Sequence, residues 1–125
     1  MQNDQANAAF HLITEPATIP VPGNKIIHEY LGRVNSGTDL ISVARMEAPS
    51  GWSEPPQKPE FDEITIMLEG KLTVNINGKK LELEAGQVLL TRKGFRVQYA
   101  NPNTETAVYW AICLPAFSPE LAGRE

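Results

Sequence analysis

The stretch GWSEPPQKPEFDEITIMLEG, residues 51–70, decides the fold of this chain. Its first half contains three prolines, which cannot donate to a β-ladder, so we expect an extended approach there instead of a central strand. Residues 62–70, DEITIMLEG, are rich in β-branched side chains and have the length of a strand. The stretch therefore predicts an extended segment that leads into a strand.

Short segments of the same kind surround this stretch. Asn77-Gly78 is the strongest short hairpin signal, because both central positions of a type I′ turn need positive φ. Residues 26–34, IIHEYLGRV, fit either a strand or a short helix, and we favour a strand. Further strand candidates, separated by Gly, Pro or Asn, are residues 40–49, 71–76, 80–86, 87–94, 95–102 and 107–115. The pattern predicts an all-β chain that forms an antiparallel sandwich or a closed barrel.

The spacing of Gly and Glu within residues 51–70 resembles the first motif of the cupins, which are small antiparallel β-barrels. In that motif a Gly is followed by five residues, His-x-His, three or four residues, Glu, six residues and Gly. Gly51, Glu63 and Gly70 fall on this frame. Gln57 and Pro59 stand where a metal-binding cupin carries its two histidines.

The second cupin motif also keeps its spacing in this chain. Its usual form is Gly, five residues, Pro-x-Gly, two residues, His, three residues and Asn. Gly86, Gly94 and Asn101 match, whereas Arg92 replaces the proline and Val97 replaces the histidine. The resemblance implies a single antiparallel β-barrel, or jelly roll, of the cupin type.

The resemblance also implies that the usual metal ligands, three imidazoles and one carboxylate, are lost except for Glu63. Gln57 offers a neutral amide oxygen, and Pro59 and Val97 offer no side-chain donor atom. One carboxylate and one amide hold a divalent ion poorly against water, so we expect no metal and no other cofactor. Near-stoichiometric iron, nickel or zinc that is lost on Glu63→Ala would contradict this expectation.

The contents of the vacated cavity follow from strand alternation. If residues 57, 59 and 63 point inward as in cupins, the period of two places Phe61, Thr65 and Met67 on the same side. On a later strand, Val97 inward brings Tyr99 inward as well. Glu63 is the catalytic candidate. The substrate-binding candidates are Arg45, Gln57, Phe61, Thr65, Met67, Val97 and Tyr99.

Two charged candidates each have a structural alternative. Glu63 is either a remnant of the fold that pairs with a neighbour, or a desolvated acid whose pKa is raised toward neutrality. Arg45 lies in an apolar strand, so it must reach solvent or find a carboxylate. It either holds an anionic substrate or pairs with an acid at the barrel rim.

The other candidates favour structural roles. Tyr99, Tyr109 and Trp110 are of the type that packs small cores, and Cys113 is expected to be a small buried hydrophobe. We expect a solvated rim at the barrel mouth, formed by Glu54, Lys58, Glu60 and Asp62.

Composition excludes several classes of protein. The chain has 125 residues and a net charge of -4, which argues against a nucleic-acid surface. No apolar run approaches the roughly 18 residues of a membrane helix, and the polar start lacks the order of a signal peptide. Its one cysteine cannot form an internal disulfide, so we expect a cytoplasmic protein.

We expect three parts: an extended arm over residues 1–20, a barrel over residues 21–115 and a tail over residues 116–125. The proline-bearing arm is the candidate for strand exchange in a homodimer, the partner that the resemblance implies.

Three functions remain open from the residues. The first is a metal-independent isomerase, lyase or cyclase in which Glu63 moves a proton on a small polar or carboxylate substrate. The second is a non-catalytic barrel that binds or senses a small metabolite. The third is an atypical metal site that recruits His11 or His28.

Overall fold

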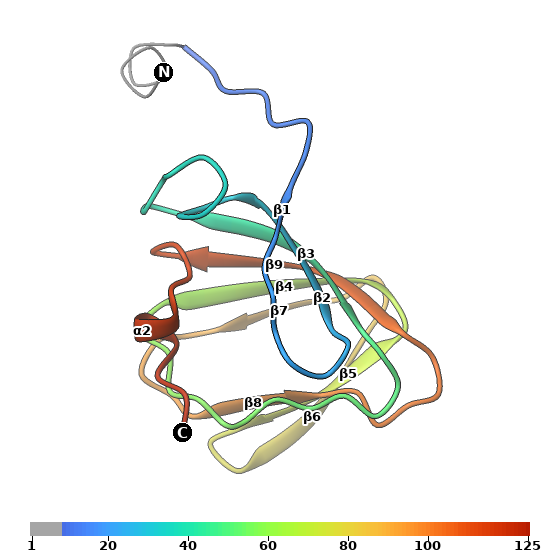
Figure 1. Cartoon of the computed structure of the whole chain (residues 1–125). Helices are drawn as coiled ribbons and strands as arrows, with labels where there is room; N and C mark the ends of the chain where they lie inside the picture. Colours follow the sequence, from blue (N-terminus) through green and yellow to red (C-terminus); the bar gives the residue numbers. More distant parts are fainter. Residues whose placement is uncertain (1–8) are drawn as a thin grey trace.

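The computed structural model describes residues 9–125, and within them two antiparallel sheets curve around a common interior (Figure 1). The larger sheet has the order β1 (Ala17–Thr18), β2 (Ile26–Leu31), β3 (Ser42–Ala48), β9 (Ala107–Leu114), β4 (Asp62–Glu69) and β7 (Val88–Thr91). The smaller sheet has the order β6 (Lys79–Glu84), β5 (Lys71–Ile76) and β8 (Val97–Ala100). The predicted all-β barrel is confirmed.

Strand β4 has the inward and outward faces that alternation predicts. Glu63, Thr65 and Met67 are buried, whereas Ile64 and Ile66 between them are only half-buried. The strand lies between β9 and β7 and pairs with both, which fixes its register from two sides. Glu63 is therefore held on a central strand of the larger sheet and faces the interior.

Residues 26–34, which fit either a strand or a short helix in the sequence, contain strand β2, as we favoured. It pairs with β1 on one side and β3 on the other. Its Glu29 carboxylate is buried and accepts hydrogen bonds from the backbone amides of Val34 and Asn35, at 2.9 and 2.8 Å. Glu29 therefore stabilises the loop after β2.

The predicted hairpin is present between β5 and β6. Asn77 and Gly78 have φ values of 52° and 84°, both positive as a type I′ turn requires. Ile76 pairs with Lys79 across the turn, so the hairpin has the shortest loop that this turn allows. The turn brings β6 alongside β5 and completes this edge of the smaller sheet.

The C-terminal residues pack along the proline-rich approach to β4. Helix α2 (Pro119–Ala122) is a single turn, and the chain after it runs back beside residues 56–60 (Figure 1). The amides of Lys58 and Glu60 donate to the carbonyls of Gly123 and Leu121, at 2.9 and 2.7 Å. The tail thereby closes one end of the barrel.

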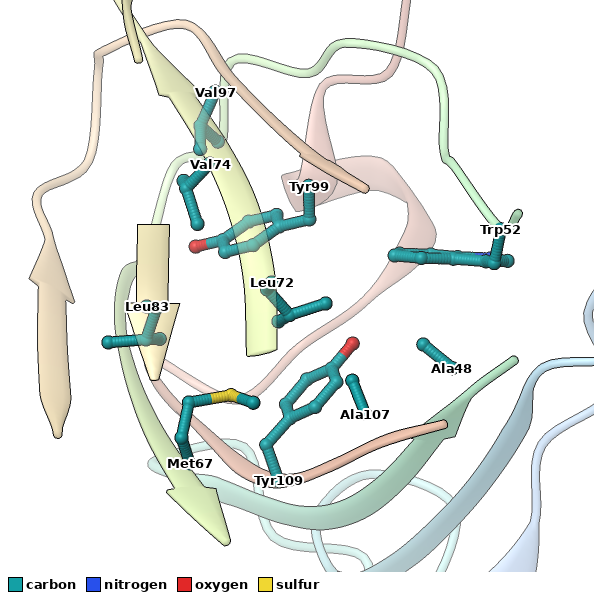
Figure 2. Close-up of a cluster of buried hydrophobic side chains, with 10 residues drawn as sticks. All are labelled: Ala48, Trp52, Met67, Leu72, Val74, Leu83, Val97, Tyr99, Ala107 and Tyr109. Carbon is teal, nitrogen blue, oxygen red and sulfur yellow. The ribbon is translucent and has the colours of Figure 1, made fainter. Parts of the chain in front are cut away.

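Two apolar clusters fill most of the interior. The larger contains Met67, Val97 and the two tyrosines, Tyr99 and Tyr109, which Figure 2 shows among smaller aliphatic side chains. The smaller joins Phe61 and Cys113 to the C-terminal segment. In the described part of the chain, no helix has the length and apolar character needed to cross a membrane.

Candidate functional site

A cavity of about 140 Å³ lies between the two apolar clusters, with walls from both. Most of its lining residues are apolar, among them Ile27, Met46 and Phe61. Charged groups at its wall come from Lys25, Glu29, Glu54, Glu63 and Arg124. A mostly apolar hollow with a few convergent polar groups is typical of a small-molecule site.

Glu63 is the buried acid of this cavity. Its residue is 9% exposed, and its backbone pairs with Thr91 on one side and Cys113 on the other. Burial, with a smaller contribution from the charge of Glu54, raises the pKa of Glu63 from 4.5 to about 7, while Lys25 opposes the rise. Near neutral pH this carboxyl group therefore exists in both protonation states.

Two tyrosines, Tyr99 and Tyr109, line the same cavity as Glu63. The Tyr99 hydroxyl lies 3.2 Å from the hydroxyl of Thr91, and burial together with the charge of Glu63 raises the pKa of Tyr99 well above its usual value. The Tyr109 hydroxyl points toward the space between Trp52 and Tyr99 (Figure 2), and burial raises the pKa of Tyr109 as well. Both phenols therefore stay protonated and can donate hydrogen bonds.

Lys25 enters the cavity from the turn that precedes β2. Gly23 and Asn24 both have positive φ, 86° and 60°, which turns the chain sharply before Lys25. The Lys25 Nζ lies 3.9 Å from the centre of the Trp52 ring and 5.5 Å from that of Tyr109. Burial lowers the pKa of Lys25 from 10.5 to about 8, although Glu54 and Glu63 act in the opposite direction.

Glu54 is not part of the solvated rim that we expected from the sequence. It lines the cavity, and its Oε2 atom is buried without a hydrogen-bond partner among the described residues. Burial raises the pKa of Glu54, opposed by the charges of Lys25 and Arg124. The expectation was wrong because the proline-rich approach folds over the barrel mouth and brings this side chain inside.

Arg124 reaches the cavity from the C-terminal tail. Its Nε lies 3.4 Å from Oε1 of Gln57, and its guanidinium lies 5.6 Å from the centre of the Phe117 ring. Within residues 9–125, ion pairs within 4 Å form only at Arg45–Glu47 and Arg96–Glu125. Lys25 and Arg124 therefore face the cavity without a carboxylate in direct contact.

The structure brings four of the predicted site residues to the cavity wall, which are Gln57, Phe61, Glu63 and Tyr99. Thr65, Met67 and Val97 are buried on the predicted inward face but do not line the cavity. The Oγ1 atom of Thr65 is also buried and has no hydrogen-bond partner in the part of the chain that the structure describes.

The expected place of Arg45 was wrong. Alternation along β3 turns Ser42, Ala44 and Met46 toward the cavity, so Arg45 lies on the opposite face of the sheet. Its Nη1 pairs with Oε2 of Glu47 at 2.8 Å, and both side chains are about one-third exposed. Arg45 therefore reaches solvent and pairs with a carboxylate. Of its two predicted roles, this is the structural one and not the binding of an anionic substrate.

The donor set at the cupin metal position does not fit a transition-metal ion. Glu63 is the one carboxylate among those four positions, with the amide of Gln57, and Pro59 and Val97 supply no donor atom. Neither His11 nor His28 lines the cavity. No group of three His, Cys, Asp or Glu side chains able to hold a metal occurs within residues 9–125.

Residues 25–117 match the sequence family described as Ethanolamine utilisation protein EutQ. The chain belongs to the EutQ family. That family match begins at Lys25 and covers every strand except β1. It also ends before Arg124, so one charged group of the cavity lies outside the matched region.

Solved structures similar to this EutQ-family chain share its cupin barrel. KdgF from Halomonas sp. is 14% identical with a TM-score of 0.70, and covers 84% of this chain and 91% of its own. A predicted oxalate decarboxylase from Thermotoga maritima is 21% identical with a TM-score of 0.69, over 84% and 99%. The EutQ protein of Clostridium difficile is 19% identical with a TM-score of 0.61, over 74% and 65%. The chain is thus a cupin, as its two motifs indicated.

A protein of Myxococcus xanthus named Endoribonuclease YbeY is 49% identical over 107 residues. The matched region is 86% of this chain but 36% of that protein. The EutQ-family chain therefore spans about a third of the length of this relative.

Sequence reasoning missed Lys25 and Arg124, which line the same cavity. Lys25 directly follows PVPGN, a sequence that predicts a turn. The direction of the chain after this turn was the one signal that could have indicated the position of Lys25. Arg124 is the penultimate residue in a tail without strand periodicity, and no sequence signal indicates its position.

Proposed function

We propose that this EutQ-family cupin binds a small metabolite in its cavity and moves a proton on it without a metal. The observation that carries the proposal is Glu63, an acid in a mostly apolar cavity with a pKa of about 7. A general acid or base works best when its pKa lies near the working pH. Isomerase, lyase or cyclase chemistry is the class that this group supports.

The size of the cavity limits the substrate. Its volume of about 140 Å³ is well below the roughly 300–1,000 Å³ of pockets that hold drug-sized ligands. A compound of a few carbon atoms fits this space. RNA does not, so the name of the M. xanthus relative gives no reason to propose nuclease activity for this cavity.

The polar groups at the wall suggest how such a compound is oriented. Gln57 offers an amide and Tyr99 a phenol on the wall that also carries Glu63. Arg124 takes the anion-binding role that the sequence suggested for Arg45, because it faces the cavity and has no ion pair within 4 Å among residues 9–125. A small carboxylate or polar carbonyl compound matches this set of groups.

Deuterium exchange tests the proposal without knowledge of the substrate. Small carbonyl and carboxylate metabolites are incubated with the protein in D₂O, and loss of their acidic C–H signals is followed by proton NMR. We expect exchange into at least one compound, and a loss of roughly 10²–10⁴-fold in Glu63→Gln. The exposed Glu60, which does not line the cavity, gives the control Glu60→Gln, which should keep the wild-type rate.

Two results would contradict the proposal. Exchange that is unchanged in Glu63→Gln would remove this carboxyl group from the chemistry. A compound that raises the melting temperature of the protein but shows no exchange would indicate a metabolite-binding or sensing barrel instead of an enzyme.

A further inference from the structure

We propose that Lys25 binds the substrate covalently, as an imine with the carbonyl carbon of a small oxo acid. This inference rests on the proposed function for the position of the substrate in the cavity. It adds a nucleophile and a substrate class to the acid–base group.

The position of Lys25 suits a nucleophile. Lys25, Glu54 and Arg124 line both the main cavity and an adjoining hollow of about 70 Å³ that also contacts Trp52. A compound that passes from this hollow into the cavity therefore passes Lys25, Glu54 and Arg124. The turn at Gly23 and Asn24 and the contact of Nζ with the Trp52 ring hold the amine at this entrance.

The protonation state of Lys25 allows attack near neutral pH. Its residue as a whole is only half-buried, but burial of the amine lowers its pKa to about 8. About a tenth of the amine is then neutral at pH 7, far more than for an ordinary surface lysine. A neutral amine in a mostly apolar site is the form that attacks carbonyl carbons.

The Glu54 carboxylate is the hydrogen-bond acceptor for the protonated imine. Its Oε2 is buried and accepts no hydrogen bond from any described residue. A protonated imine carries a positive charge and an N–H group, so it offers this oxygen both a donor and an opposite charge. The same charge relieves the cost of burying the Glu54 carboxylate.

Arg124 defines the acid part of the substrate. Its guanidinium lies at the same entrance, and the contact of its Nε with Oε1 of Gln57 is long, at 3.4 Å. A carboxylate next to the carbonyl group would give this cation a bidentate partner while the carbonyl carbon faces Lys25. A small 2-oxo acid carries both groups on adjacent carbons.

The covalent step needs no oxidant or reductant. The lone pair of the neutral Lys25 Nζ forms the C–N bond, and the carbonyl π pair moves to oxygen, which takes a proton from Glu63. The nitrogen then gives one of its two protons back to Glu63. The hydroxyl group takes that proton and leaves as water, and the nitrogen lone pair forms the C=N bond. The neutral amine, the oxo acid and one proton from Glu63 thus give the protonated imine, water and the Glu63 carboxylate.

Reductive trapping tests the inference. Wild-type protein is incubated with pyruvate and sodium cyanoborohydride, which reduces imines to stable secondary amines, and the modified lysines are mapped by peptide mass spectrometry. We expect modification at Lys25 at least about tenfold above that at Lys58, an exposed lysine, because the lowered pKa leaves more free amine. Equal modification of the two lysines would overturn the inference.

Matched variants separate the parts of the inference. Lys25→Met keeps an unbranched side chain against Trp52 and should remove the dominant adduct, whereas Lys58→Met should keep it. Arg124→Met should lower trapping of pyruvate about tenfold more than trapping of uncharged propanal, because the lost ion pair affects only the acid. Equal effects on both probes would overturn the oxo-acid assignment.

The two proposals fail in different ways. A pyruvate adduct at Lys25 with no deuterium exchange in any compound supports the covalent site and contradicts the proposal that Glu63 removes a proton from carbon. Deuterium exchange that survives in Lys25→Met, without an adduct in wild type, contradicts the covalent site and supports the acid–base function.

Discussion

At the residue scale, Glu63 occupies the carboxylate position of the first cupin motif, and its burial disfavours the charged form. The first cupin motif located it in the sequence, and the period of two predicted its inward direction, which the burial of β4 confirms. Lys25 was not predicted because its place depends on a turn and on packing against Trp52, neither of which has a sequence period. The charges that share a cavity are therefore less predictable than the strand that carries one of them.

The raised pKa of Glu63 predicts how stability depends on pH. Between its usual value of 4.5 and about 7, the folded chain keeps a proton that the unfolded chain has lost. The free energy of unfolding therefore falls as pH rises through this window and stays lower above it. We expect Glu63→Gln to equal wild type near pH 4.5 and to be more stable by roughly 2–3 kcal/mol above pH 7.

Urea unfolding at both ends of this window measures the difference. Glu60→Gln, which changes an exposed acid, should follow the wild-type pH dependence. A Glu63→Gln variant that loses stability with rising pH as steeply as wild type would contradict the assignment.

At the element scale, strands were predictable and their connections were not. Strands β4, β5 and β6 follow from alternation, and the turn between the last two follows from Asn77-Gly78. The position of the C-terminal tail depends on backbone hydrogen bonds to residues 56–60, which any sequence can form. Arg124 could not be placed at the cavity for this reason.

Gly123 is the residue that allows the tail to close the barrel. Its φ is +61°, and a Cβ atom there would overlap the carbonyl oxygen of Lys58. We expect Gly123→Ala to lower the free energy of unfolding by more than the roughly 1–2 kcal/mol of a left-handed alanine alone. Gly51→Ala is the control, because Gly51 has a φ of +83° with nothing within 4 Å.

Chemical denaturation of both variants separates strain from overlap. If Gly123→Ala costs no more than Gly51→Ala, close contact between the tail and residues 56–60 is not what fixes the tail.

At the scale of the whole molecule, the two cupin motifs were enough to predict the barrel from the sequence. Gly51, Gly70, Gly86 and Gly94 all adopt positive φ, so the spacing of glycines encodes the turns of the fold and not only a family signature. The ligand positions of the motifs gave a different kind of information, because Pro59 and Val97 supply no donor atom and the cavity lining is mostly apolar.

The N-terminal arm predicts association of two chains. Strand β1 is two residues long, and the residues before it leave Phe10 and Leu12 80% and 76% exposed in the single chain. A partner that covers such side chains would gain apolar burial. We expect a homodimer in light scattering at micromolar concentration, and a monomer after removal of residues 1–18. A full-length chain that scatters as a monomer would contradict strand exchange.

The central claim is that Glu63, at a ligand position of the cupin motif, is a buried acid that titrates near neutral pH. Carbon-13 NMR of the Glu63 side-chain carboxyl, titrated in wild type and assigned with Glu63→Gln, measures this directly. The account predicts a midpoint near 7, raised by burial from 4.5. A midpoint close to 4.5 would show a solvated or paired carboxylate and would contradict the account.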